Sequence, residues 1–354
     1  MLKLIRKLFF VFLILAAWAG LSFLIDPFGV FHPDKVRIYE DTSRNENFVK
    51  TYHVVSNPEK YNAFLIGSSR VGGLPVDYLP TERNGVKLSW YSLNYPSGTP
   101  EEFYDTVLML LKYNVHVESL VVCFENNAKF HSVHENEMDL QTVPFKKWDK
   151  SKFDFYKYFF FIKPDKDLLS SMMNYDEKKA EISRTGYYSN THAGNFYVPE
   201  KQEWNKDYEV AGFSTGAYTE KTAPVALGKI SELCSENNIQ CTFILNPTFQ
   251  NVYKKETTLG LYDFIFDVAQ NCDFYNFAGL NKYTNDLRYF RDRSHFIDFV
   301  GGEMEKVVFG SEEEKKSAIE AASENLPYKT GFGMLITKDN VQELIDVLKT
   351  QPID

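Results

Sequence analysis

The chain begins with a short basic segment and then an uncharged, mostly apolar run over residues 8–25. As a helix, these eighteen residues would rise about 27 Å, close to the roughly 30 Å hydrocarbon core of a bilayer. The basic residues Lys3, Arg6 and Lys7 precede the run, so we expect residues 1–7 to stay in the cytoplasm and the chain to cross once. The run therefore predicts a transmembrane signal anchor in the cell membrane, with the bulk of the chain extracytoplasmic.

A cleaved signal peptide is the alternative to this anchor, because Ala17-Trp18-Ala19 has the small-x-small pattern of a cleavage site. The apolar run continues beyond that site through Leu21–Ile25, which favours an uncleaved anchor. The net charge is −9, and the part that follows the three basic residues carries −12. Such a domain is repelled by anionic lipid, and it lacks the basic stripe of a nucleic-acid-binding protein.

Residues 26–45 are rich in Pro and Gly near their start and predict a juxtamembrane linker, so the globular domain is expected over 46–310. Hydrophobic residues make up 44% of the chain and charged residues 25%, which is enough for a sizeable core. Short apolar segments alternate with amphipathic ones, which predicts an α/β fold around a parallel sheet. The expected strands are 61–66, 87–93, 117–124, 240–245 and 273–277, and the expected helices are 100–112, 225–236 and 259–269.

This alternation is interrupted over about 129–220, which predicts a long insertion of helices and loops that caps the sheet. The aromatic run Phe153–Phe161 lies in this insertion, but it is too short and too charged for a second membrane span. Residues 311–354 are expected to form a C-terminal helical tail, with an amphipathic helix over 340–348.

Four cysteines are present, and disulfides are permitted in an exported domain. Cys234 and Cys241 are seven residues apart across an expected helix-to-strand turn, so a local bridge is feasible and is left open. Cys123 lies in an apolar strand and is expected to be a buried thiol. The absence of a CxxC pair argues against structural zinc, and no motif for a cofactor or another metal is found.

Polar residues follow four of the expected strands, and ligands of a parallel sheet bind at the carboxyl ends of its strands. We therefore expect these residues to lie at one edge. They are Gly67, Ser68, Ser69 and Arg70 after the first strand, Asn94, Ser97 and Gly98 after the second, Glu125, Asn126 and Asn127 after the third, and Asp292 to His295 after the fifth.

This set contains the groups that acyl transfer requires. Ser69 supplies a hydroxyl nucleophile, His295 a base, and Asp292 an acid to orient that base. The backbone N–H groups of Ser69 and Gly98, with the side-chain amide of Asn126, form the expected oxyanion hole. The competing interpretation is that Gly-Ser-Ser and Asp-Arg-Ser-His are ordinary turns, in which Ser and Asp cap nearby backbone N–H groups.

In their order, these residues resemble the SGNH, or GDSL-type, family of hydrolases and acyltransferases. Gly67-Ser68-Ser69 matches the family's Gly-Asp-Ser, Gly98 its second element, residues 124–127 its Gly-x-Asn-Asp, and residues 292–295 its Asp-x-x-His. The third element lacks its glycine, and Asn127 replaces an acid. The likeness covers roughly 62–302 without the insertion and selects Ser69 over Ser68 as nucleophile.

The resemblance implies a three-layer, flavodoxin-like sheet and a Ser-His-Asp esterase or acyltransferase. It is closer to membrane-anchored members, such as the D-alanyl transfer protein of teichoic acid synthesis and proteins that modify surface polysaccharides. It implies an envelope glycan or an acyl-carrying substrate, and a membrane-bound acyltransferase as partner. Arg70 is expected in an ion pair or on an anionic substrate, and Tyr187 and Tyr188 on sugar rings. The alternatives are a non-catalytic glycan-binding scaffold and an accessory subunit of a transporter.

Overall fold

The computed structural model of the chain describes residues 2–33, 45–125, 140, 142–160, 217–219, 221–292 and 294–353. Most of the predicted insertion lies outside these residues. The same holds for four residues singled out above, namely Asn126, Asn127, Tyr187 and Tyr188.

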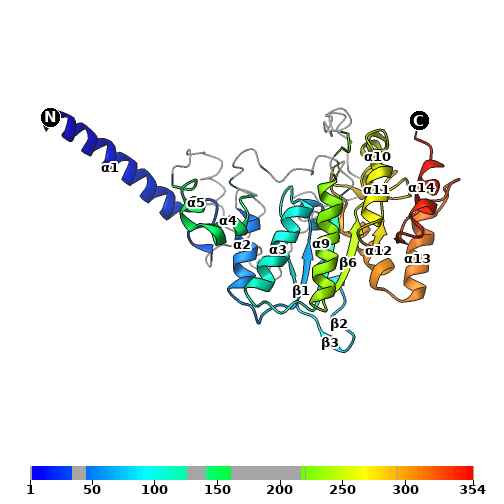
Figure 1. Cartoon of the computed structure of the whole chain (residues 1–354). Helices are drawn as coiled ribbons and strands as arrows, with labels where there is room; N and C mark the ends of the chain where they lie inside the picture. The colour runs from blue at the N-terminus through cyan, green and yellow to red at the C-terminus, as the bar shows by residue number, and fades with distance from the viewer. Residues whose placement is uncertain are drawn as a thin grey trace.

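The strands and helices that the sequence predicts are found in the predicted order, with further helices and strands between and after them (Figure 1). The helices are α1 (Leu2–Ile25), α2 (Glu46–Val55), α3 (Pro100–Lys112), α4 (Phe145–Lys150), α5 (Lys152–Tyr156), α9 (Thr222–Glu236), α10 (Gln250–Thr257), α11 (Leu261–Ala269), α12 (Asp298–Phe309), α13 (Glu312–Ser323) and α14 (Val341–Lys349), with short 3₁₀ helices η2 (Ser69–Gly73), η3 (Val76–Tyr78) and η6 (Leu287–Tyr289). The strands are β1 (Ala63–Ile66), β2 (Glu82–Arg83), β3 (Val86–Lys87), β4 (Trp90–Ser92), β5 (Ser119–Phe124), β6 (Gln240–Leu245), β7 (Phe274–Asn276) and β8 (Met334–Ile336).

Six strands form one sheet in the order β4-β1-β5-β6-β7-β8, and β2 pairs with β3 in a separate hairpin. The first five strands are parallel, and only β8 runs antiparallel, beside β7. The chain moves outward from β1 in one direction to β4 and in the other to β5. The carboxyl ends of β1 and its two neighbours therefore meet at the point where the strand order reverses.

Helices cover both faces of this sheet. Successive residues of β1 point to opposite faces, as in any strand. Phe64 and Ile66 therefore join one buried cluster with residues of α2, α3, α9, α11 and α14. Ala63 and Leu65 join a second cluster with residues of η2, η3, α12 and α13. The α/β class and the mostly parallel sheet are thus confirmed.

Helix α3 shows why several expected boundaries agree with the structure. Thr99 caps the helix by accepting from the N–H of Glu102, whose carboxylate accepts from the N–H of Thr99, and Pro100 occupies the first turn. This reciprocal capping fixes where the helix begins. The expected strand over 87–93 is narrower in the structure, since β3 and β4 are separated by two residues.

The C-terminal segment contributes to the sheet as well as adding helices. Beyond α13, β8 pairs with β7, with Ile336 opposite Phe274. Helix α14 buries Leu344 and Leu348 in the first cluster. The segment expected as a helical tail is therefore packed onto the domain, through a strand of three residues that is too short for its pattern to show.

Helix α1 is the one described helix that is long and apolar enough to cross a bilayer, with a mean hydropathy of 2.6 over its best window. It extends away from the domain (Figure 1). The segment that follows it is packed, because the Asp26 carboxylate accepts from the N–H groups of Val30, Phe31 and His32, at 2.7–3.0 Å. The first part of the expected linker is therefore held against the domain core.

All four cysteines are thiols in the structure. Burial raises the pKa of the Cys123 thiol well above its usual value, as expected for a buried strand position. Cys234 and Cys241 are also unbridged, so the local disulfide that the spacing allows is not formed.

We predict that α1 remains attached and orients the domain outward. A reporter fused after Asp354 should behave as extracytoplasmic, and the full-length chain should sediment with membranes after washing with high salt. The physical reason is the basic flank before α1, which favours retention of the N-terminus on the cytoplasmic side. A soluble product that begins near Gly20 would show instead that the helix is a cleaved signal peptide.

Candidate active site

Ser69 lies at the carboxyl end of β1, at the first position of η2. Ser68 is the N-cap of this 3₁₀ helix, since its Oγ accepts from the N–H of Arg70 at 3.3 Å. The two serines therefore differ in role. Ser68 caps the turn, whereas Ser69 presents its hydroxyl at the edge of the sheet.

His295 lies directly in front of that hydroxyl. Its Nε2 is 2.8 Å from Ser69 Oγ. Its Nδ1 is 2.8 Å and 2.9 Å from the two carboxylate oxygens of Asp292. The structure thus brings the three predicted residues together in the order acid, imidazole, hydroxyl.

The Asp292 carboxylate is fixed by its own turn as well as by the imidazole. Its Oδ1 accepts from the N–H groups of Ser294 and His295, at 2.7 Å and 2.9 Å. Burial acts to raise the pKa of Asp292, but the hydrogen bond and charge of His295 and these two backbone N–H groups outweigh it and lower the pKa to about 2. Asp292 is therefore ionised at neutral pH and holds His295 with Nδ1 as the donor.

An imidazole in this tautomer has its Nε2 lone pair directed at the Ser69 hydroxyl. It is placed to accept the serine proton as the oxygen attacks an acyl carbon and to return a proton to the leaving group. Nucleophile, base and orienting acid are all within hydrogen-bond distance, which is the arrangement that covalent serine catalysis requires.

Under the capping serine lies the carboxyl of Glu125, which is expected at this edge of the sheet and is buried in the structure. Ser68 Oγ donates to Glu125 Oε1, and Asn246 Nδ2 is 3.4 Å from the same oxygen. Burial raises the pKa of Glu125, against the opposing charges of Arg70 and His295 and these two hydrogen bonds. Asn246 directly follows β6, so the rule that selected the other strand ends also applies to it.

Arg70 is buried, at 4% exposure, beside two carboxyl groups. Its charge opposes the rise in pKa of both Glu125 and Glu256, and burial nevertheless raises the pKa of Glu256 to about 8. Arg70 is thus enclosed beside carboxyl groups, and its expected roles in an ion pair or on an anionic substrate stay predictions.

The predicted oxyanion hole is only partly described. Asn126 lies outside the described residues. Gly98 lies in the loop after β4. This loop is joined to the segment after β1, since the N–H of Tyr95 donates to Gly67 O at 3.3 Å. A Cβ on Gly98 would come within 2.7 Å of the Phe103 ring, so packing alone accounts for glycine there, and its N–H remains a predicted donor.

Two glycines bring the serine and histidine segments into direct backbone contact. A Cβ on Gly301 of α12 would lie 1.7 Å from the carbonyl oxygen of Gly73 in η2. A Cβ on Gly73 would lie 2.5 Å from the Phe296 ring. Because Ser69 begins η2 and His295 precedes α12 by three residues, this close packing sets the distance between them.

We predict that Gly301→Ala separates α12 from η2. Overpacking against backbone costs about 1–3 kcal/mol of unfolding free energy, and displacement of His295 should lower ester turnover at least about tenfold. Gly302→Ala is the matched control, since its Cβ would meet only the Tyr78 ring at 3.2 Å, and Tyr78 is 64% exposed. In this control variant, the change from glycine to alanine within a helix should raise the free energy of unfolding by about 0.5–1 kcal/mol. The measurements are the melting temperature and the ester turnover of each variant. Equal changes in Gly301→Ala and Gly302→Ala would contradict this account.

Within the described part of the chain, no group of three or more His, Cys, Asp and Glu side chains is arranged to hold a metal ion. Comparison of the chain with models of protein families, with curated proteins and with solved structures finds no match. The function is therefore argued from the site itself.

Proposed function

We propose that this protein is a membrane-anchored serine esterase or acyltransferase of the SGNH type, which acts outside the cytoplasm on an acyl group of a cell-envelope polysaccharide or related polymer. Ser69 is the nucleophile, His295 the general acid and base, and Asp292 the residue that orients it. The observation that carries the proposal is the continuous hydrogen-bonded path from Asp292 through His295 to Ser69 Oγ.

The arrangement of the sheet supports this proposal. If the five parallel strands are numbered along the chain, their order is 2-1-3-4-5, which is the flavodoxin-like order. Ser69 follows β1, which lies next to the edge strand β4, at the point where this order reverses. Such a point is where open α/β sheets bind ligands.

In the proposed reaction, Ser69 Oγ attacks the carbonyl carbon of an ester or thioester while His295 takes its proton. The bond to the leaving oxygen or sulfur breaks, and His295 returns the proton to that group, which leaves an acyl-enzyme. Water or a sugar hydroxyl then attacks the acyl carbon and gives its proton to His295. The bond between the acyl carbon and Ser69 Oγ breaks, and His295 returns the proton to Oγ, which restores the free serine.

The anchor favours transfer over free hydrolysis. A domain fixed at the bilayer gains effective concentration when donor and acceptor are both held at the membrane, whereas release of a soluble product gains little from it. We therefore propose a sugar hydroxyl of the envelope polymer as acceptor.

A partition experiment tests the proposal. The full-length protein in nanodiscs is given p-nitrophenyl acetate, with and without a purified envelope polysaccharide, and both p-nitrophenol release and acetyl groups on the polymer are measured. We expect the polymer to capture acetyl groups in the wild type and not in Ser69→Ala. Rapid hydrolysis without capture would show an esterase, whereas polymer binding without turnover would favour the glycan-binding scaffold.

A further inference from the structure

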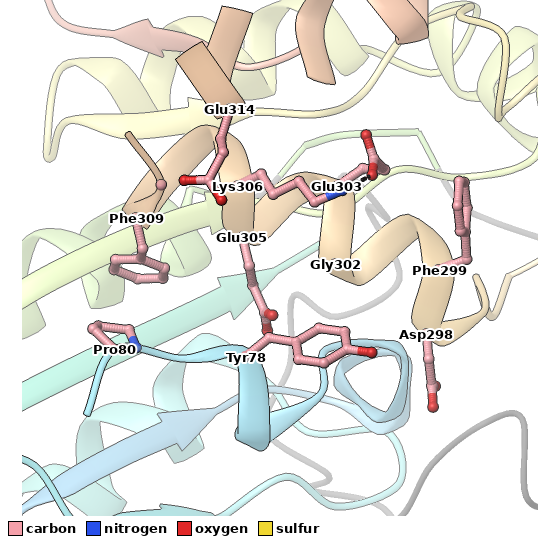
Figure 2. Close-up of a pocket in the computed structure, with 11 residues that line it drawn as sticks. Tyr78, Pro80, Asp298, Phe299, Gly302, Glu303, Glu305, Lys306, Phe309 and Glu314 are labelled. Carbon is pink, nitrogen blue, oxygen red and sulfur yellow. Dashed lines mark hydrogen bonds and ion pairs between the residues drawn. The ribbon is translucent and has the colours of Figure 1, made fainter. Parts of the chain in front are cut away.

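A pocket lies along α12, on the side of the helix that faces η3. Its volume is about 660 Å³, within the usual range for small-molecule sites. Rings line it from both sides, namely Tyr78 and Pro80 from the η3 segment and Phe299 and Phe309 from α12 (Figure 2). This pocket has no part in the proposed acyl transfer.

Glu305 projects into the inner part of this pocket, and Figure 2 shows its carboxyl group directed toward Tyr78. Glu305 is 2% exposed, and within the part of the chain that the structure describes neither of its carboxyl oxygens has a hydrogen-bond partner. A buried carboxyl group without a donor costs free energy, so an unpartnered one in a cavity indicates a donor that is supplied from outside.

The charges around the pocket indicate the sign of that ligand. Its lining holds four carboxyl groups and one ammonium group, and the ammonium of Lys306 is paired with Glu303 at 2.5 Å. The lining is therefore net negative. Aromatic side chains beside carboxylates are a favourable setting for an organic cation, because the ring faces attract positive charge.

We propose that this pocket binds a primary ammonium compound with a small apolar body, whose N–H groups donate to the Glu305 carboxylate. The apolar body packs between Tyr78 and the rings of α12. Among the acids that line the pocket, Glu305 is the most buried, and it alone has two carboxyl oxygens without a partner among the described residues.

The proposal predicts that binding releases a proton. Burial, with the nearby charge of Asp298, raises the pKa of Glu305 to about 9. The Glu305 carboxyl group in the empty pocket is therefore protonated at neutral pH. An ammonium group binds the ionised carboxylate, so binding releases that proton to the solvent. Affinity should then increase with pH as Glu305 ionises, up to the pH at which the ammonium group itself begins to lose its proton.

Other titratable and charged groups face this region from each neighbouring element. They are Asp298, Glu303 and Lys306 on α12, Glu314 on α13, Tyr78 on η3, Cys123 on β5, and Arg83, whose guanidinium lies 6.0 Å from the Phe309 ring. All of them remain in a Glu305→Gln variant, so a pH dependence lost in that variant belongs to Glu305.

The test uses the full-length protein in zwitterionic nanodiscs, with empty nanodiscs as background. Two fluorinated probes are compared by ¹⁹F NMR, 2-(4-fluorophenyl)ethylammonium and the uncharged 2-(4-fluorophenyl)ethanol. At pH 8.5 we expect the ammonium probe to bind about tenfold more tightly or better, as a charge-assisted hydrogen bond provides. Its association constant should rise about tenfold per pH unit from 6.5 to 8.5.

Two variants and one control locate the effect. Glu305→Gln should remove both the preference and the pH dependence, whereas Glu303→Gln, whose partner is Lys306, should change the preference less than about threefold. Gly302→Leu fills the pocket beside Tyr78 and should abolish binding of both probes while serine labelling persists. Equal affinity for the two probes, or a preference that survives either Glu305→Gln or Gly302→Leu, would overturn the proposal.

Discussion

Replacing Ser69 by alanine is expected to remove nearly all ester turnover. The loss should be at least about 10⁴-fold, because removal of the nucleophile of a triad leaves only binding and oxyanion stabilisation. The substitution removes one heavy atom, the hydroxyl oxygen, which contacts His295 Nε2 at 2.8 Å. The fold should therefore be retained. Turnover of p-nitrophenyl acetate, with a thermal melt of the same sample, measures both effects.

Ser68→Ala is the matched control, since it removes the same atom one residue earlier. Ser68 caps η2 and donates to Glu125. Its loss should cost about 0.5–2 kcal/mol of unfolding free energy, as for other capping serines, while most labelling by a serine-directed phosphonate remains. The two variants are thus expected to separate stability from chemistry. If labelling were lost in Ser68→Ala and retained in Ser69→Ala, Ser68 would be the nucleophile and this assignment would be wrong.

Asp292→Asn is the second large effect, with an expected fall of about 10³–10⁴-fold in kcat. The asparagine oxygen still accepts from the backbone N–H groups, but its amide donates toward Nδ1 and favours the tautomer in which Nε2 carries the proton. His295 then has no lone pair for the Ser69 hydroxyl. The measurement is kcat and KM together, since loss of a base orienter lowers kcat with little change in KM.

The same variant tests the electrostatics through stability against pH. The pKa of Asp292 is lowered to about 2, so its stabilising effect is fully present above the unfolded value, near 3.9, and is lost as the pH falls through 2. The difference in unfolding free energy between wild type and Asp292→Asn should therefore shrink as the pH is lowered from 5 toward 2. A difference that stayed constant over this range would contradict the hydrogen-bonded geometry of Asp292.

Much of the sheet could be predicted from the sequence because its strands are short, apolar and bounded by turn residues. The expected strand over 240–245 and helix over 100–112 coincide with β6 and α3. The three triad residues could also be placed, since each follows a strand or lies in a turn near the end of the domain. Once the parallel order is known, such residues have to meet at one edge.

The buried acids could not be predicted in this way. A glutamate in a sequence is normally read as an exposed residue, yet Glu125, Glu256 and Glu305 are all buried. Glu256 and Glu305 lie on the helices α10 and α12, and a helical pattern does not reveal that a charged residue faces the core. The contact between Gly73 and Gly301 is similarly set by tertiary packing over more than two hundred residues of chain.

The most direct test of the central claim is to trap the acyl-enzyme and locate it. The full-length protein is mixed with p-nitrophenyl acetate, quenched in acid within the first turnover, and weighed intact before digestion. The account predicts one acetyl group per chain, mapped by fragmentation to Ser69, and none in Ser69→Ala. An acetyl group on another residue at the same rate in both proteins, or turnover without any adduct in the wild type, would contradict it.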